Sequence, residues 1–249
     1  MRAYSRVDPG VVAFAKDRRY HPLDALDYML ILFEDKITND QGTYPWKNYG
    51  TAGSSQNMVA VDNFKIGWGG IWGPAGFFST NGTDGDGEAA ASNPNTSNVS
   101  WMVWVKYVAV IGSPFYKAYG DSGWTSPYIG LGLNHGGSGG TIQALCNTSS
   151  TLRQTGSTAT IPTVAGPWNH YCGTYDGATL SCYHNGALSG SASVSGTLTY
   201  GTPGKWRLNA TNQSDESGDC IYQYFRMRNE VVSAAWLREE YALGAGYYL

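Results

Sequence analysis

Short apolar stretches, separated by clusters of Gly, Asn, Asp, Ser and Pro, run along most of this 249-residue chain. The strongest stretch, residues 101–111, is rich in β-branched and aromatic residues and partly alternates between apolar and polar positions, as strands do. Repeated short strands with turns between them predict an all-β sandwich or jelly roll. We expect further strands at residues 26–33, 128–133, 141–146, 168–175, 179–184, 205–209 and 221–228.

Charged residues are scarce, which argues against a mostly helical fold. They make up 14% of the chain, aromatic residues make up another 14%, and glycine supplies 33 residues, whereas exposed helix faces need more charge. A single short amphipathic helix is expected at residues 234–243, capped by Ser233 and ended by Gly244. Residues 73–98 and 112–140 are expected to be loops. No run of about 18 apolar residues predicts a membrane span.

Basic residues are concentrated at the start of the chain. Residues 1–20 hold five basic and two acidic side chains, a local charge of +3, and the remainder holds 11 basic and 17 acidic ones, a charge of −6. An acidic body argues against nucleic-acid binding, which requires a basic face. We therefore divide the chain into an N-terminal basic arm (1–20) and one sandwich domain (21–249). The arm either lies on its own domain or docks on a partner. Its basic side chains are Arg2, Arg6, Lys16, Arg18 and Arg19.

Residues 168–186 have the pattern of a β-hairpin. Two alternating apolar segments flank Asp176-Gly177, and Asn185-Gly186 follows as a second turn.

The length of the first turn decides which hairpin side chains meet. A three-residue loop would set Cys172 opposite Cys182 and His170 opposite His184. A two-residue loop would turn the residues of the two strands to opposite faces. Four cysteines in the chain are too few for a disulfide scaffold. For the hairpin cysteines we expect buried free thiols, with a cross-strand disulfide or a metal site as the alternatives.

The hairpin resembles the central hairpin of laminin-G-like, concanavalin A-like jelly-roll domains. A Trp, a His, Thr-Tyr-Asp-Gly and then Tyr-x-Asn-Gly recur there at this spacing. Ordered matches extend from about residue 26 to residue 243, and the first 20 residues fall outside them. They include residues 78–84, 101–106, 168–177, 180–186, 224–229 and 232–235. The resemblance implies a concanavalin A-like β-sandwich with a closing helix, and a structural role for His170.

Catalysis is not expected. The glucanases that share this fold carry paired carboxylates on one strand, in a Glu-x-Asp-x-x-Glu or Glu-x-Asp-x-Glu pattern, because glycoside hydrolysis uses two carboxyl groups about 5–9 Å apart. No predicted strand of this chain carries such a pattern. We therefore expect a protein that is not an enzyme.

Three acidic residues at alternate positions, Asp84, Asp86 and Glu88, are the candidates for a cation site. An EF-hand starting at Asp84 would need glycine at position six and a carboxylate at position twelve, where this chain has Ala89 and Asn95. We expect a solvated hairpin turn here, with no metal and no cofactor. Calcium at a loop edge, which the resemblance implies for many such domains, is the alternative.

Aromatic side chains give the candidate recognition surface, because they stack on sugar rings and anchor protein contacts. Four tryptophans lie in predicted strands and are expected in the core: Trp101, Trp104, Trp168 and Trp206. Three lie in Gly-rich segments and are expected to be exposed: Trp68, Trp72 and Trp124. The candidate patch for glycan or partner contact comprises Tyr119, Asp121, Trp124, Tyr128 and His135.

These features favour a structural virion protein of a bacteriophage, such as a capsid decoration, head fibre or tail-associated subunit. The start of the chain has no apolar core resembling a secretory signal, and phage proteins reach the outside by lysis. We expect assembly in the host cytoplasm, other virion subunits as partners, a homo-oligomer, and contact with host-surface carbohydrate. The alternative is a free, extracellular carbohydrate-binding module. Neither nucleic acid nor a membrane is an expected partner.

Overall fold

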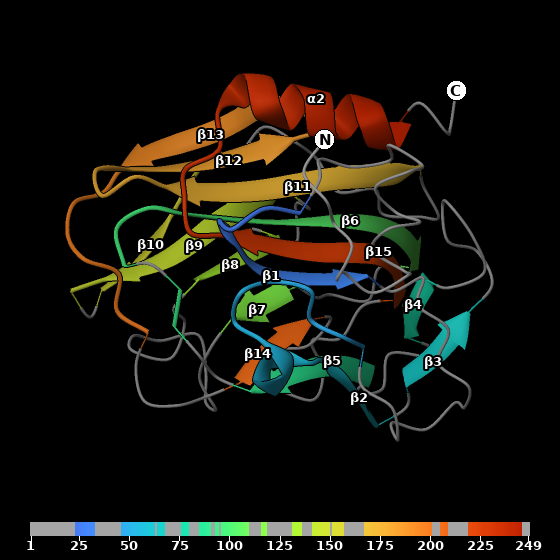
Figure 1. Ribbon diagram of the computed structural model, residues 1–249. Coiled ribbons are helices and arrows are strands. Elements are labelled where there is room, and N and C mark those ends of the chain that lie inside the picture. The colour runs from blue at the N-terminus through green and yellow to red at the C-terminus, as the bar shows by residue number, and fades with distance from the viewer. Residues whose placement is uncertain are drawn as a thin grey trace, which may run out of the picture.

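Two antiparallel β-sheets, packed face to face, form the body of the protein (Figure 1). The computed structural model describes residues 23–32, 46–62, 64–67, 76–79, 85–90, 93–94, 96–109, 116–118, 131–135, 141–149, 151–156, 167–200, 205–208 and 219–245. One α-helix, α2 (Ala234–Ala245), and one short 3-10 helix, η1 (Ser54–Gln56), accompany the strands in this part of the chain.

One sheet has eight strands and the other has seven. The larger runs in the order β13 (Ala187–Ser193), β12 (Thr179–His184), β11 (Trp168–Tyr175), β6 (Val99–Ala109), β15 (Asp219–Arg228), β4 (Gly76–Ser79) and β3 (Phe64–Gly67), and β1 (Asp27–Leu32) also pairs with β15. The smaller runs in the order β10 (Thr151–Gln154), β9 (Ile142–Thr148), β8 (Leu131–His135), β7 (Tyr116–Ala118), β14 (Lys205–Leu208), β5 (Gly85–Ala90) and β2 (Val59–Asp62). The predicted all-β sandwich is therefore confirmed.

The predicted strands are all present; two keep their predicted bounds, and the ends of the others shift by one to three residues. Strands β11 and β12 have the predicted bounds. The strand predicted at 101–111 begins earlier, at Val99, and ends at Ala109. Only the second half of the segment predicted at 128–133 lies in β8, and residues 128–130 lie outside the described part.

The two segments predicted to be loops contain strands, so that prediction is wrong. Residues 73–98 include β4 and β5, and residues 112–140 include β7 and also β8, which the separate prediction of a strand at 128–133 located in part. The sequence of β5, Gly-Asp-Gly-Glu-Ala-Ala, has little intrinsic preference for strand. It pairs with β2 on one side and β14 on the other, and this pairing outweighs the local preference.

The main core lies between the sheets and takes residues from both of them. It includes Trp101 and Val103 of β6, Tyr171 of β11, Ile142 of β9 and Trp206 of β14. The four tryptophans predicted to be in the core are buried, with exposed fractions of 8% or less. That prediction is confirmed.

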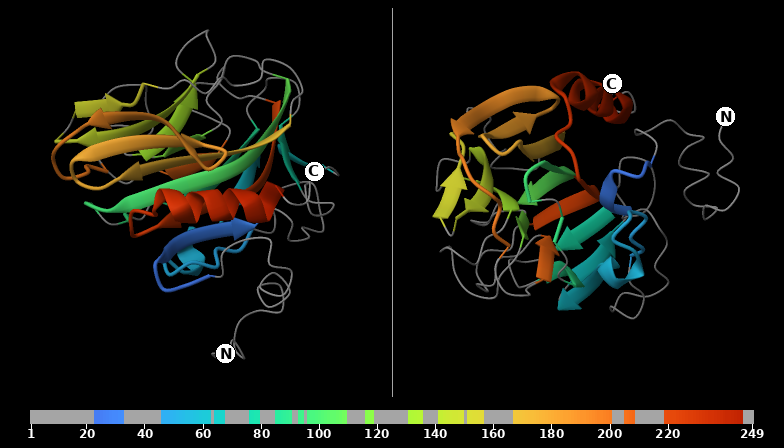
Figure 2. Two further views of the ribbon diagram at one scale, coloured as in Figure 1. Left: turned by 90° about the horizontal axis from the view of Figure 1, so that it is seen from above. Right: turned by 60° about the vertical axis from the view of Figure 1, so that its left-hand side comes forward.

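A second hydrophobic cluster lies on the outer face of the eight-stranded sheet, under α2. Side chains alternate across a strand, so that Trp101 of β6 faces the main core while Met102 and Trp104 face outward. Figure 1 and the two views of Figure 2 show α2 along this sheet, away from the seven-stranded one. The outer cluster comprises Leu30, Met102, Trp104, Trp168, Cys172, Tyr224, Val232 and Leu237.

Helix α2 begins as predicted and ends later. The Ser233 hydroxyl accepts a hydrogen bond from the Trp236 amide at 3.1 Å, which confirms the N-cap. Gly244 does not end the helix, as was predicted, because the helix continues to Ala245. Gly244 lies against the ring of Trp104, where a Cβ atom would overlap the ring. Close packing explains this glycine. No helix in the described segments is long and apolar enough to cross a membrane.

Candidate functional site

The predicted contact patch lies mostly outside the described residues. This applies to Tyr119, Asp121, Trp124 and Tyr128, and to the whole basic arm. His135 is the last residue of β8, and its backbone pairs with Ile142 of β9. The patch and the arm therefore stay predictions.

The acidic segment near residue 84 is a strand where a turn was predicted. Asp84 lies outside the described part, whereas Asp86 and Glu88 belong to β5 and pair with Val61 and Val59 of β2. The turn prediction is wrong for residues 85–90, because β5 pairs with β2 and β14 on its two sides. Among the described residues, no group of three His, Cys, Asp or Glu side chains could hold a metal.

The hairpin loop is longer than the two-residue and three-residue loops considered from the sequence. Tyr175 pairs with Leu180 and Gly173 pairs with Cys182. Four residues, 176–179, therefore lie between the first paired positions, although Thr179 already belongs to β12. The Asp176 carboxylate accepts hydrogen bonds from the amides of Ala178 (2.9 Å) and Thr179 (2.6 Å). This Asx-type turn stabilises the longer loop. The two predicted registers did not include a loop of this length.

The register separates the two hairpin cysteines. Cys172 pairs with Tyr183 and lies in the outer cluster, whereas Cys182 pairs with Gly173 and lies in the main core. Both are buried free thiols, like Cys146. Burial raises the pKa of Cys182 to about 12 and raises that of Cys172 as well. The expected free thiols are confirmed, and the disulfide and metal alternatives are excluded because the two sulfur atoms lie on opposite faces.

The two hairpin histidines do not face each other either. His184 pairs with Tyr171 of β11 and stacks on its ring, with centroids 4.9 Å apart. Its Nε2 lies 2.8 Å from Asn169 Oδ1. His170 points to the outer face, where its ring lies 5.3 Å from that of Trp104 and its Nε2 lies 3.1 Å from Tyr224 Oη.

A chain of buried polar groups starts at His170 and runs beneath α2. The Tyr224 hydroxyl donates to Glu240 Oε1 on α2 at 2.8 Å. The same carboxylate oxygen lies 3.6 Å from Nη1 of Arg226. His170, Tyr224, Arg226 and Glu240 are each 1% exposed or less, so this chain is closed to solvent on every side.

The series of buried polar contacts continues to strand β1. Arg226 donates to both carboxylate oxygens of Asp27, at 2.6 and 2.8 Å. Arg228 donates to Asp27 at 2.9 Å and to Asp24 at 2.7 Å, and it also pairs with Glu230. Burial by itself lowers the pKa of the Arg226 guanidinium, but Glu240 and Asp27 outweigh this effect and raise it.

This charge network, His170-Tyr224-Glu240-Arg226-Asp27-Arg228, holds α2 and β1 on one sheet. The half-buried Trp236 of α2 covers the network. Its ring lies 5.2 Å from the guanidinium carbons of both Arg226 and Arg228. The network's two buried carboxylates, Asp27 and Glu240, both contact Arg226 and neither faces an opening. They therefore lack the room for substrate and water that glycoside hydrolysis requires.

Apart from His170, sequence reasoning missed this network. Arg226 and Arg228 stand at alternate positions of a strand that is otherwise apolar on that face, and Glu240 stands between Leu237 and Tyr241 on the buried side of a helix. Polar residues at predicted core positions are the signal that could have found them.

The sequence profile of the concanavalin A-like lectin/glucanases superfamily matches residues 81–238, more than half of the chain. The chain belongs to this superfamily. The resemblance drawn from the hairpin and the outer strands is confirmed, and the fold is concanavalin A-like. Among curated protein sequences, none matches the chain.

Solved structures of low sequence identity share the fold. Domain 4 of AbnA, an extracellular arabinanase from Geobacillus stearothermophilus solved in complex with arabinotriose, is 15% identical with a TM-score of 0.64, and 87% of this chain covers 98% of it. Trypanosoma rangeli sialidase is 14% identical with a TM-score of 0.62, and 96% of this chain covers 38% of it. The binding domain of botulinum neurotoxin serotype G is 12% identical with a TM-score of 0.62, and 88% of this chain covers 51% of it.

The chain thus spans little more than a third of the sialidase's length. Its fold is that of the concanavalin A-like lectin/glucanases superfamily.

Proposed function

We propose that this protein is a non-enzymatic recognition subunit that binds carbohydrate through its lectin-like sandwich. The observation that carries the proposal is the superfamily match over residues 81–238. Its support comes from a whole-domain likeness to AbnA domain 4, whose structure holds arabinotriose, and from a likeness to a toxin binding domain.

The absence of an enzymatic activity is part of the proposal. The buried carboxylates of the described part, Asp27 and Glu240, both contact the Arg226 guanidinium. Both are fully buried, so neither is open to a substrate. The sequence also lacks the strand-borne carboxylate pattern of the related glucanases.

The proposed setting is the outside of a bacteriophage particle, as a capsid decoration, head fibre or tail-associated subunit. The basic arm (1–20) docks on neighbouring virion subunits, and the sandwich faces outward toward host-surface carbohydrate. The acidic body and low charge of the sequence support this setting, since a surface packed beside other subunits needs few charges. The protein would then be located in the virion. A free extracellular carbohydrate-binding module is the second candidate, favoured by the likeness to AbnA domain 4.

Glycan binding is tested on the purified full-length chain with an array of bacterial surface glycans and plant oligosaccharides, arabinotriose among them. We expect binding that falls at least tenfold in the Trp124→Ala variant, because an aromatic ring that stacks on sugar contributes about 1 kcal/mol or more. The control is Leu188→Ala, which removes an exposed apolar side chain on β13 (59% exposed).

The carbohydrate proposal fails if the array shows no hit. Binding that is equal in the wild type and in both variants would keep the recognition function but move the site away from Trp124.

A further inference from the structure

The His170 end of the charge network has one defined arrangement of hydrogens. The Glu240 carboxylate can only accept, so the hydroxyl hydrogen of Tyr224 points to Glu240. The Tyr224 oxygen is then left to accept from His170 Nε2. The neutral imidazole therefore carries its hydrogen on Nε2, and Nδ1 has the free lone pair.

Protonation of His170 would place a new hydrogen on Nδ1, deep beneath α2. Nδ1 is buried and has no hydrogen-bond partner among the described residues. A buried donor without an acceptor is destabilising, and more so when it carries charge. The docked helix therefore opposes protonation of this ring.

The charged and titratable groups around His170 come from several elements. Strand β15 supplies Tyr224 and the Arg226 cation, and α2 supplies Glu240. The neighbouring strand β12 supplies His184, and β11 itself supplies Cys172. Glu240 is the only anion among these five groups, and it is already engaged by Tyr224 and Arg226.

From this cluster we infer that α2 is an acid-released clasp. Protonation of His170 undocks the helix from the outer face of the eight-stranded sheet while the two packed sheets stay folded. The protonated ring is solvated in the undocked form and unsolvated in the docked form, so acid favours undocking. The undocked form exposes the outer cluster, with its tryptophans Trp104 and Trp168.

The burial of His170 and the charges around it also favour undocking of α2 in acid. Burial, followed by the nearby His184 and Arg226, lowers the pKa of His170 from its ordinary value of 6.5 to about 3. The undocked form, with an ordinary histidine, binds the proton below pH 6.5, and the docked form does so only near pH 3. Between these limits the opening equilibrium constant rises about tenfold for each pH unit of acidification.

The buried thiols offer a direct readout that separates undocking from unfolding. Cys172 is in the outer cluster with Leu237 of α2, and it becomes accessible when the helix leaves. Cys146 and Cys182 are in the main core and become accessible only when the sheets separate.

The experiment labels the folded full-length protein with 4,4′-dithiodipyridine between pH 7.0 and 4.5 and assigns the labelled cysteine by peptide mass spectrometry. Each rate is divided by that of a short cysteine peptide at the same pH. We expect this ratio to rise about 100-fold for Cys172 over this range, with Cys146 and Cys182 still protected. The His170→Gln variant, which keeps a donor to Tyr224 but cannot ionise, is expected to change less than threefold.

The matched control is His184→Gln, at the other hairpin histidine. It removes one contribution to the lowered pKa of His170 but leaves His170 able to ionise, so the Cys172 ratio should still rise steeply with acid. The clasp is refuted if Cys172 is labelled only together with Cys182, if its ratio does not rise with acid, or if His170→Gln follows the wild-type slope. Should His170→Gln fail to fold, hydrogen exchange of the wild type decides: α2 amides must lose protection with this pH slope while β11 amides keep theirs.

Discussion

Arg226 and Arg228 show at the level of single residues why a charge is tolerated inside this protein. Each is 2% exposed or less, and each donates to the buried Asp27 carboxylate. Arg228 also donates to Asp24, and Arg226 forms an ion pair with Glu240. A buried charge is stable only when it is paired and hydrogen-bonded. The network therefore depends on each of its members.

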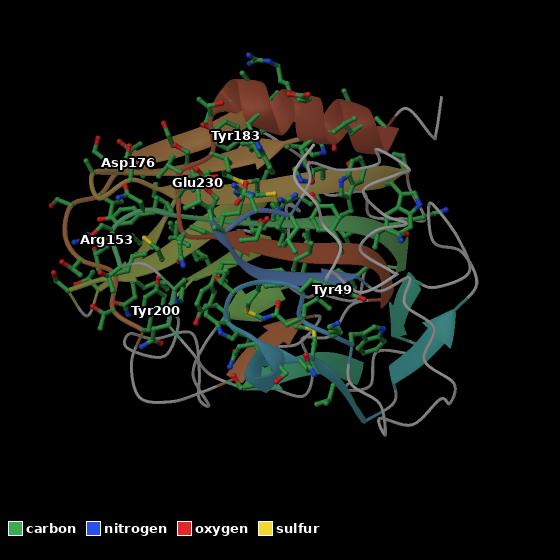
Figure 3. All side chains as sticks on the ribbon, viewed as in Figure 1. Tyr49, Arg153, Asp176, Tyr183, Tyr200 and Glu230 are labelled. Carbon is green, nitrogen blue, oxygen red and sulfur yellow. The ribbon has the colours of Figure 1, made fainter. Side chains whose placement is uncertain are left out.

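Removing one member should be far more costly than removing a similar charge at the surface. Arg226→Met leaves Asp27 without two of its donors and Glu240 without its cation, and we expect a loss of about 3–5 kcal/mol in the free energy of unfolding. Urea denaturation followed by circular dichroism measures it. The control is Arg153→Met on strand β10, which Figure 3 shows at one end of the sandwich, away from α2.

Arg153 is exposed, so its replacement should change stability by less than about 0.5 kcal/mol. Equal losses in the two variants would show that the network contributes no more than a surface charge does.

At the level of elements, α2 depends on its first turn and on close packing near its end. Ser233 caps the first turn through Trp236, and Gly244 lets the last turn approach Trp104. The sequence predicted the cap because the signal is local. It could not predict the role of Gly244, which depends on a ring from strand β6.

Loss of the cap should weaken the docking of α2. Ser233→Ala leaves an amide of the first turn without its acceptor, and we expect a cost of about 1 kcal/mol. Hydrogen exchange at neutral pH should show faster exchange of the α2 amides, by about fivefold. The control Ser195→Ala, at an exposed position after β13, should leave these rates unchanged. An unchanged α2 in Ser233→Ala would mean that the cap does not limit docking.

At the scale of the whole molecule, the charge network joins the first described strand and the C-terminal helix to one sheet. Strand β1 is the first strand of the described part, α2 follows β15, and the charge network joins both to the eight-stranded sheet. These contacts begin at Asp24, so the proposed docking of residues 1–20 on neighbouring subunits can be tested without disturbing them.

Deletion of residues 1–20 tests this docking role. The deletion spares Asp24, Asp27 and β1, so the melting temperature should stay within about 2 °C of that of the full chain. Incorporation into phage particles, measured as copies per purified particle, should be lost. Undiminished occupancy would contradict docking through the arm, and absence of the full-length chain from particles would contradict the virion setting.

The sequence by itself determined the class of fold, because strand and turn signals are local. Alternating apolar residues and turn-forming Asn, Asp and Gly predicted the hairpin strands within their bounds, and four tryptophans in predicted strands proved to be buried. The strands it missed, such as β5, have little strand preference of their own and form because neighbours pair with them on both sides.

The tertiary structure alone decided which side chains meet. An additional loop residue in the hairpin placed Cys172 and Cys182 on opposite faces. Arg226 bonds Asp27 across 199 positions of the chain, a contact that exists only because β1 and β15 are neighbours. Register and strand order are set by packing of the whole sandwich, so no local pattern could have revealed the buried network that holds the helix.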